Sequence, residues 1–405
     1  MSGPLSGITV IDLTRVLAGP WCTQILGDLG ANVIKIEKPG SGDDTRKFAP
    51  PFLRDPKTGR ETGESAYFAG ANRNKRSLAL DIAKPQGQAV LKKLLANADV
   101  LVENFKTGTL TRYGLGFEHV KAMNPGLVYC SITGFGQTGP YAQRPGYDFL
   151  IQGAGGLMSL TGEPDGEPQK AGVPISDLTA GMYAGVAICA ALRHREITGQ
   201  GQYIDIGMLD TTVAYLSNQG MNYLASGEVP PRLGNAHPNI VPYQVFKTAD
   251  GHVIVAVGND EQFKKFCGFA GAPELPNDPL FKSNDLRVRN RQAVLEKLAP
   301  VMAAKPSKHW LEGLEKLGIG VGPINNLDQV FADPHVKARD MVVEMPHKAA
   351  GGAKVPLLAS PLKLSATPVS YRHAPPMLGE HTDEVLKEFG FDDAEIAALK
   401  ADRVI

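Results

Sequence analysis

The alternation of short apolar strand patterns with helical patterns in the first half of the chain constrains its fold most. Ile8–Leu13 (ITVIDL), Asn32–Glu37 (NVIKIE) and Leu127–Ile132 (LVYCSI) predict buried strands, because each is a β-branched run of strand length. Lys84–Ala98 has helical spacing and leads into a further strand at Asp99–Val102. Strands that alternate with helices form βαβ units, so we expect an α/β fold with a mostly parallel sheet covered on both faces.

A change in the sequence pattern after Ser226, from helix and strand patterns to a Pro- and Gly-rich stretch, predicts a second, smaller domain. Before it, the sequence predicts a helix from Asp177 to about Arg195, a strand over Gln202–Gly207 and a helix over Leu209–Leu224. Gly227–Gln244 is then dense in Pro and Gly and reads as a loop.

Beyond this loop the patterns indicate a small α+β unit. Tyr243–Lys247 and His252–Val257, joined by an Asp-Gly turn, predict a hairpin. Helices are predicted around Gln262–Phe269, over Arg291–Ala303 and, at the end of the chain, over Thr382–Phe389.

The length of 405 residues and the 43% of hydrophobic residues allow two or three buried cores. We expect a large α/β domain over residues 1–225, a small α+β domain over 226–325, and a C-terminal segment over 326–405 that returns to the large domain.

Charge and cysteine content exclude several classes of protein. Lys+Arg and Asp+Glu both count 42, which argues against general nucleic-acid binding. The four cysteines lie far apart without metal-ligand spacing, so we expect buried reduced thiols and no metal site at Cys22, Cys130, Cys189 and Cys267.

Targeting segments are also not expected. Asp12 and Arg15 lie where a signal peptide would need its apolar stretch. The longest apolar run, Ala180–Leu192, is too short to span a bilayer. These features predict a cytoplasmic protein without a membrane or nucleic-acid partner.

The usual catalytic and nucleotide motifs do not occur. The GAGG run at Gly153–Gly156 lacks the third glycine and the later acidic residue of a dinucleotide fingerprint. No phosphate loop, HExxH or GxSxG motif is found. A nicotinamide oxidoreductase therefore stays only a remote alternative.

Eight blocks together resemble the class III CoA-transferases, the CaiB/BaiF group that includes formyl-CoA transferase. They follow at the expected intervals nearly end to end: LSGITVIDLTRVLAGP (Leu5–Pro20), LGANVIKIEKPGSGDDTR (Leu29–Arg46), NRNKRSLALD (Asn72–Asp81), VENF (Val102–Phe105), GYD (Gly146–Asp148), SDLTAGMYA (Ser176–Ala184), TGQGQYIDIGMLD (Thr198–Asp210) and LGEHTDEVL (Leu378–Leu386). The resemblance implies a large Rossmann-like CoA-binding domain and an interlocked homodimer.

The resemblance also implies a nucleophile at Asp177. An aspartate just before an apolar helical run is ordinarily an N-cap, and this role is compatible with catalysis because a helix N-terminus holds a carboxylate ionised. In a water-poor pocket the carboxylate can attack a thioester and form a mixed anhydride. The oxyanion donors are expected from the loop at Gly234-Asn235, although this loop is not the run of glycines found in formyl-CoA transferase.

The CoA contacts that the family positions imply are spread over six segments. Cations and backbone amides must meet the CoA phosphates. The family often has Arg where Lys38 stands, and formyl-CoA transferase has Gln where Leu17 stands. The implied contacts are Val16, Leu17, Ala18, Lys38, Leu80, Asn104, Phe105, Arg112 and Tyr147.

The most similar subgroup indicates the substrates. The blocks at Asp43–Phe52, Ser131–Pro140, Ile240–Gly251 and Gly322–Phe331 look most like succinate/glutarate CoA-transferases. We therefore expect CoA transfer from succinyl-CoA to a dicarboxylate such as glutarate or hydroxymethylglutarate, with the CoA thioester as substrate and no permanently bound cofactor.

Two other functions compete with this prediction. The 2-methylacyl-CoA racemases of the same family carry a His where this chain has Tyr147, and tyrosine is a poor base at neutral pH. A non-catalytic acyl-CoA binding protein, with Asp177 only a helix cap, is the second alternative.

Overall fold

The computed structural model describes residues 3–405, which divide into two compact units. The larger unit consists of the chain up to Gly155, Ala171–Tyr215 and Lys337–Ile405. The smaller unit consists of Gly156–Lys170 and Leu216–Val336. The sequence-based limits of the small domain, 226–325, fall inside this last range.

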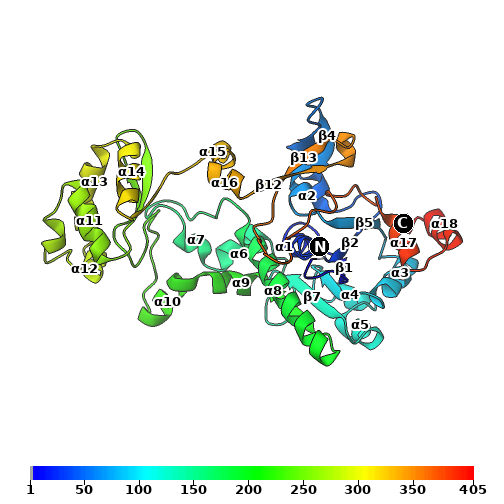
Figure 1. The fold of residues 1–405 in the computed structure, drawn as a ribbon. Helices are drawn as coiled ribbons and strands as arrows, with labels where there is room; N and C mark the ends of the chain where they lie inside the picture. The colour runs from blue at the N-terminus through cyan, green and yellow to red at the C-terminus, as the bar shows by residue number, and fades with distance from the viewer. Residues whose placement is uncertain (1–2) are drawn as a thin grey trace. The chain divides into compact units, whose positions relative to one another are not determined.

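A six-stranded parallel sheet forms the centre of the larger unit (Figure 1). Its strand order is β5-β2-β1-β6-β7-β8, and all neighbours pair in parallel. Counted within the sheet, this is the 3-2-1-4-5-6 order of a Rossmann fold. The predicted α/β class is therefore confirmed, with strands β1 (Thr9–Asp12), β2 (Asn32–Glu37), β5 (Lys75–Ala79), β6 (Val100–Glu103), β7 (Val128–Thr133) and β8 (Tyr203–Gly207).

Helices bury both faces of this sheet. On one face Val10 and Val33 pack against α1 (Ala18–Asp28) and α8 (Ile175–Thr198). On the other face their neighbours Ile11 and Ile34 pack against α3 (Pro85–Leu95) and α17 (Thr382–Glu388). Burial on both faces explains why the strand sequences are continuous apolar runs instead of alternating patterns.

The C-terminal segment completes the larger unit. Arg76 of β5 donates to Glu384 and Glu388 of α17, at 2.7 Å each. The predicted last helix is followed by another, α18. The remaining elements of the unit are η1 (Asp44–Lys47), β3 (Phe52–Arg54), β4 (Glu61–Ser65), α2 (Ala66–Gly70), α4 (Thr109–Arg112), α5 (Phe117–Met123), α6 (Asp148–Ala154), α9 (Met208–Tyr215), β12 (Val342–Pro346), η3 (Lys348–Ala350), β13 (Lys354–Leu358) and α18 (Asp393–Ala401).

The smaller unit combines helices with an antiparallel sheet of order β11-β10-β9. The predicted hairpin is confirmed as β9 and β10. Its core includes the buried rings of Phe263, Phe266 and Trp310. The elements are α7 (Leu157–Leu160), α10 (Ser217–Ser226), β9 (Tyr243–Lys247), β10 (His252–Ala256), α11 (Asp260–Ala270), η2 (Leu275–Asn277), α12 (Asn284–Arg289), α13 (Arg291–Ala303), α14 (Ser307–Lys316), β11 (Gly320–Gly322) and α15 (Leu327–Ala332), and α16 (Pro334–Ala338) lies at the junction with the larger unit.

Three local features of the structure bear on the sequence-based predictions: the break between α9 and α10, the apolar helix α8 and the cysteines. The single helix predicted over Leu209–Leu224 is wrong: Ser217 has φ +47°, and a left-handed residue interrupts the right-handed ladder between α9 and α10. Helix α8 is long and apolar enough by length and composition to cross a membrane, but half of its apolar window is buried within the protein. All four cysteines are free; Cys189 is half-buried and the other three are buried.

Candidate active site

The loops that follow β1 and β6 meet at the point where the strand order of the sheet reverses. In open α/β sheets this point is where ligands bind, at the carboxyl ends of the strands. The backbone N–H of Arg15 donates to Oδ1 of Asn104 at 2.9 Å, and Nδ2 of Asn104 donates to the Arg15 carbonyl at 2.8 Å. Glu103 accepts the N–H of Phe105 at 2.8 Å. The two loops are therefore joined in a defined geometry.

A pocket of about 390 Å³ opens beside these loops. Three of the predicted CoA contacts line it, namely Lys38, Leu80 and Phe105. Arg15 also lines it, with its guanidinium carbon 5.8 Å from the centre of the Phe105 ring. The pocket wall thus carries three cations, since Lys35 also lines it, together with carboxylates, aromatic rings and apolar side chains. Its cations and rings suit a nucleotide carrying phosphates.

The other predicted contacts do not line this pocket. Arg112 is exposed on α4, where it donates to Thr109 Oγ1 at 3.5 Å, while Thr109 itself lines the pocket. Tyr147 immediately precedes α6 and is 70% exposed. Val16, Leu17 and Ala18 form the entry to α1.

Asp177 lies inside α8 and does not cap it. The helix begins at Ile175, and its capping position, Pro174, makes no side-chain hydrogen bond. Asp148 of α6 instead binds the N-terminal amides: its Oδ1 accepts the N–H of Ser176 at 2.8 Å and of Asp177 at 3.3 Å. The predicted cap role of Asp177 is therefore wrong, because a carboxylate from a distant segment performs it.

The pKa of Asp177 is raised to about 7. Burial is the main cause, and the negative charge of Asp148 adds to it. A hydrogen bond from the backbone N–H of Ala18 acts in the opposite direction. The helix N-terminus was expected to hold this carboxylate ionised, but burial and the like charge of Asp148 raise its pKa well above the usual aspartate value. Near neutral pH about half of the Asp177 carboxyl groups are ionised.

Helices α8 and α1 touch backbone to backbone at this point. A Cβ atom at Gly181 would lie only 2.5 Å from the carbonyl oxygen of Ala18, so no larger residue fits there without movement. This close approach brings the first amide of α1 to the Asp177 carboxylate. Ala18 is therefore a contact of Asp177 in the structure.

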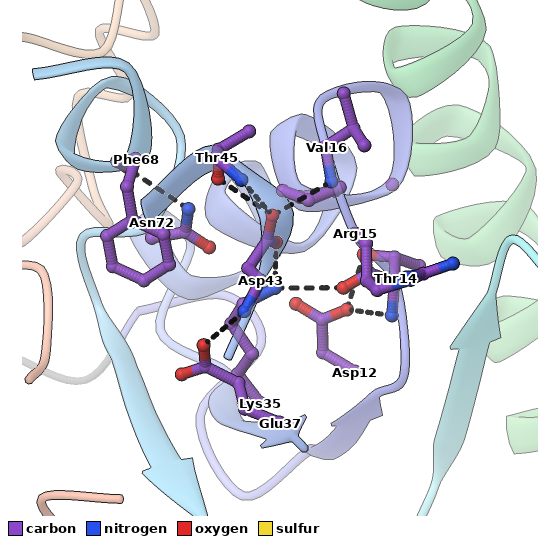
Figure 2. Close-up of polar contacts among 12 residues, drawn as sticks. Asp12, Thr14, Arg15, Val16, Lys35, Glu37, Asp43, Thr45, Phe68 and Asn72 are labelled. Carbon is purple, nitrogen blue, oxygen red and sulfur yellow. Dashed lines mark hydrogen bonds and ion pairs between the residues drawn. The ribbon is translucent and has the colours of Figure 1, made fainter. Parts of the chain in front are cut away.

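A buried ion pair lies beneath the loop that leads into α1 (Figure 2). Nζ of Lys35 is 2.9 Å from Oδ2 of Asp43, and both side chains have no exposed surface. The same ammonium donates to the carbonyl of Thr14 at 2.8 Å. Burial alone would raise the pKa of Asp43, but Lys35 and the hydrogen bonds from Thr45 hold it at about 2.

Sequence reasoning missed Lys35, Asp43, Arg15 and Asp148 as parts of the site. Lys35 gave a signal, because a lysine inside the apolar strand NVIKIE requires a buried partner. The sequence indicated Asp148 only as part of the GYD block. Its side chain binds the N–H of Ser176, which is 28 residues away, and no local sequence pattern predicts such a contact.

The loop predicted to supply oxyanion donors belongs to the smaller unit. Gly234 has φ +58°, and its N–H donates to the Gly162 carbonyl at 3.0 Å. A Cβ there would lie 3.2 Å from the Glu163 carboxylate. The participation of Gly234-Asn235 in catalysis stays a prediction. Within residues 3–405, no group of three His, Cys, Asp or Glu side chains is arranged to hold a metal ion.

Comparisons with known proteins show which proteins the chain is similar to. Residues 5–382 match the model of CoA-transferase family III. The chain is 47% identical over 385 residues to a succinate–glutarate CoA-transferase of Agrobacterium fabrum, with 95% of both chains covered. It is 44% identical over 403 residues to the human succinyl-CoA:glutarate CoA-transferase, covering 99% of this chain and 90% of the relative.

A solved structure has the same fold. A CaiB/BaiF family protein from Brucella suis superposes with a TM-score of 0.82 at 47% identity, covering 96% of this chain and 100% of that one.

Proposed function

The chain belongs to CoA-transferase family III, and on that basis we propose that it transfers CoA from succinyl-CoA to glutarate. The observation that carries the proposal is the near-full-length identity of 47% and 44% to two proteins whose names specify this substrate pair. Glutarate and succinate are both dicarboxylates, so exchange between them is close to balanced in energy.

We propose that Asp177 is the nucleophile of this transfer. One oxygen of its ionised carboxylate attacks the thioester carbonyl of succinyl-CoA, and the CoA thiolate leaves, which produces a succinyl-aspartyl anhydride. The thiolate then attacks the aspartyl carbonyl, succinate leaves, and an aspartyl-CoA thioester remains. A carboxylate oxygen of glutarate attacks this thioester, CoA thiolate leaves, and a glutaryl-aspartyl anhydride forms. The thiolate finally attacks the glutaryl carbonyl of this anhydride, which gives glutaryl-CoA and frees the Asp177 carboxylate.

The surroundings of Asp177 support this role. Burial and Asp148 raise its pKa to about 7, so an ionised fraction persists at neutral pH while the carboxylate is more nucleophilic than an ordinary aspartate. The Ala18 amide orients the carboxylate from one side. If Asp177 served only as a helix cap, its carboxylate would bind the N-terminal amides of α8. Asp148 accepts from these amides instead.

We propose that CoA binds in the pocket beside the β1 and β6 loops. Lys38 and Arg15 would meet the phosphates, and Phe105 offers a ring face. Arg112 is exposed on α4, whose residue Thr109 lines the same pocket. The predicted contacts at Val16, Leu17, Ala18, Asn104 and Tyr147 stay part of the proposal.

The experiment that tests the function is trapping of the covalent intermediate. Incubated with succinyl-CoA alone, the protein should gain the mass of a succinyl or CoA group on the peptide that contains Asp177, and hydroxylamine should convert it to a hydroxamate. Asp177→Asn should abolish both the adduct and the transfer to glutarate. Asp383→Asn, at an exposed first-turn position of α17, is the control that should retain both.

Retention of full transfer by folded Asp177→Asn would refute the proposed mechanism. Binding of succinyl-CoA without transfer by the unaltered protein would instead favour the non-catalytic alternative.

We also propose that two copies of the chain assemble. Apolar side chains are exposed on α8 and α6, including Val186 and Ile197 (both 69%) and Phe149 (60%). Light scattering after size exclusion should give twice the mass of one chain; a single-chain mass would contradict the proposal. Cytoplasmic location stays a prediction, which cell fractionation would check.

A further inference from the structure

We propose that Asp43 is a positioning residue for Asp177. It fixes the loop Thr14–Leu17, and through that loop it holds the Ala18 amide against the Asp177 carboxylate. The inference rests on the proposed catalytic role of Asp177 and extends it to a residue on another segment.

The loop has a backbone conformation that must be held in place. Val16 has φ +69°, in the left-handed region that L-residues other than glycine rarely adopt. Five non-glycine residues among residues 3–405 have positive φ, and Val16 is the β-branched one. Because a β-branched side chain strongly disfavours this region, its neighbours must over-determine the conformation.

Asp43 supplies one of these constraints directly. Its Oδ1 accepts the N–H of Val16 at 3.2 Å and also the N–H and hydroxyl of Thr45, at 2.9 and 2.7 Å (Figure 2). Its Oδ2 accepts from Lys35 at 2.9 Å. The two oxygens thus face different partners, one on the loop and one on the ion pair.

The same ion pair also holds the start of the loop. Lys35 donates to the Thr14 carbonyl, and Asn104 binds both backbone groups of Arg15. A Cβ at Gly19 would lie 2.3 Å from the Thr14 side chain, so the first turn of α1 is packed directly on this residue. Movement of Val16 would therefore move the N-terminus of α1 and with it Ala18.

Asp177 reports this movement because its pKa depends on the Ala18 hydrogen bond. That bond lowers the pKa, whereas burial and Asp148 raise it. The titratable groups that face Asp177 are Asp148 of α6 and Tyr67 of α2, whose pKa is raised by burial and by Asp177. The negative charges of Asp148 and Asp43 also contribute to the raised pKa of Tyr67. A weaker Ala18 hydrogen bond raises the Asp177 pKa further.

Asp43→Asn prevents one side chain from accepting both from Lys35 and from the loop. An asparagine has one acceptor oxygen, so it can accept from Lys35 or from Val16 and Thr45, but not from both sides. With Lys35 present, the asparagine oxygen accepts from the Lys35 ammonium. The amide NH₂ then faces the Val16 N–H, and no hydrogen bond can form between these two donors.

The readout is the titration of Asp177 itself. We expect Asp43→Asn to shift the Asp177 pKa upward by about half a pH unit or more. The shift is measured by ¹³C NMR of carboxyl-labelled aspartate, with the signal assigned by its loss in Asp177→Asn. The acid limb of the kcat/KM profile for CoA transfer should move to higher pH by the same amount, after normalisation to the folded fraction.

A neutral pair of variants tests the same point if Asp43→Asn does not fold. Lys35→Met with Asp43→Asn keeps an acceptor for Val16, whereas Lys35→Met with Asp43→Ala does not, and neither buries an unpaired charge. The Asp177 pKa should be higher in the second. Equal values would overturn the proposal, as would an unshifted titration in folded Asp43→Asn.

Asp28→Asn is the matched control, because it breaks another buried ion pair, with Arg73, at the far end of α1. The Asp177 pKa should be unchanged in Asp28→Asn. A shift equal to that in Asp43→Asn would mean that general destabilisation causes it, and would overturn the proposal. If the unaltered protein transfers no CoA, the proposed function fails, whereas the Asp177 titration still decides whether Asp43 positions this carboxylate.

Discussion

Asp148 should contribute to the pH dependence of the reaction through its charge. Replacement by Asn removes the negative charge that lies beside Asp177 but keeps an oxygen able to accept the N–H groups of Ser176 and Asp177. Asparagine caps helices about as well as aspartate, so the free energy of unfolding should fall by no more than about 1 kcal/mol. The hydrogen bond from Gln152 to Oδ2 is the contact most affected.

The size of the effect follows from the causes of the Asp177 pKa. The rise from 3.8 to about 7 comes mainly from burial, and Asp148 contributes the smaller part. Removal of its charge should therefore lower the Asp177 pKa by about one unit. At pH 6 the ionised fraction would rise from about one tenth to about one half, a gain of about fivefold, whereas at pH 8 it would hardly change.

The assay is kcat/KM for CoA transfer from succinyl-CoA to glutarate between pH 5 and 9. Because the ionised carboxylate attacks, the rate rises with pH through the Asp177 pKa, and the acid limb of Asp148→Asn should lie at lower pH. This direction is opposite to that expected for Asp43→Asn. An acid limb that stays in place or moves to higher pH would refute the electrostatic role of Asp148.

Three further predictions follow from the same geometry. Lys38→Ala removes an ammonium from the pocket wall and should raise KM for succinyl-CoA about tenfold with little change in kcat, and an unchanged KM would mean that the phosphates bind elsewhere. In deuterated water a 2-methylacyl-CoA should incorporate no deuterium at its α-carbon, because position 147 carries tyrosine and not histidine; rapid exchange seen by mass spectrometry would support a racemase. The Asp43 pKa of about 2 lies below the unfolded value of 3.8, so its stabilisation is present above pH 4 and is lost as the pH falls through 2. Urea unfolding should show the deficit of Asp43→Asn relative to the unaltered protein shrinking by about 2 kcal/mol over this range, and a constant deficit would contradict the assignment.

The sequence by itself determined the class of fold and most of its elements. The apolar run Asn32–Glu37 predicted β2 to the residue, and Arg291–Ala303 did the same for α13, because hydrophobic periodicity is a local property of the chain. The family blocks predicted a nucleophile at Asp177 and ligand contacts at the ends of β1 and β6, and these site assignments stay predictions. Burial of a sheet on both faces follows from the same continuous apolar runs.

Only the tertiary structure decided how the candidate site is held and charged. Nothing in the segment around Asp177 predicts that Asp148 caps its helix, that Ala18 donates to its carboxylate, or that its pKa lies near 7. The left-handed backbone of Val16 and the Lys35–Asp43 ion pair are likewise visible only in space. The physical reason is that burial, Coulomb energy and hydrogen bonds depend on distances between atoms, and folding sets those distances between residues far apart in the chain.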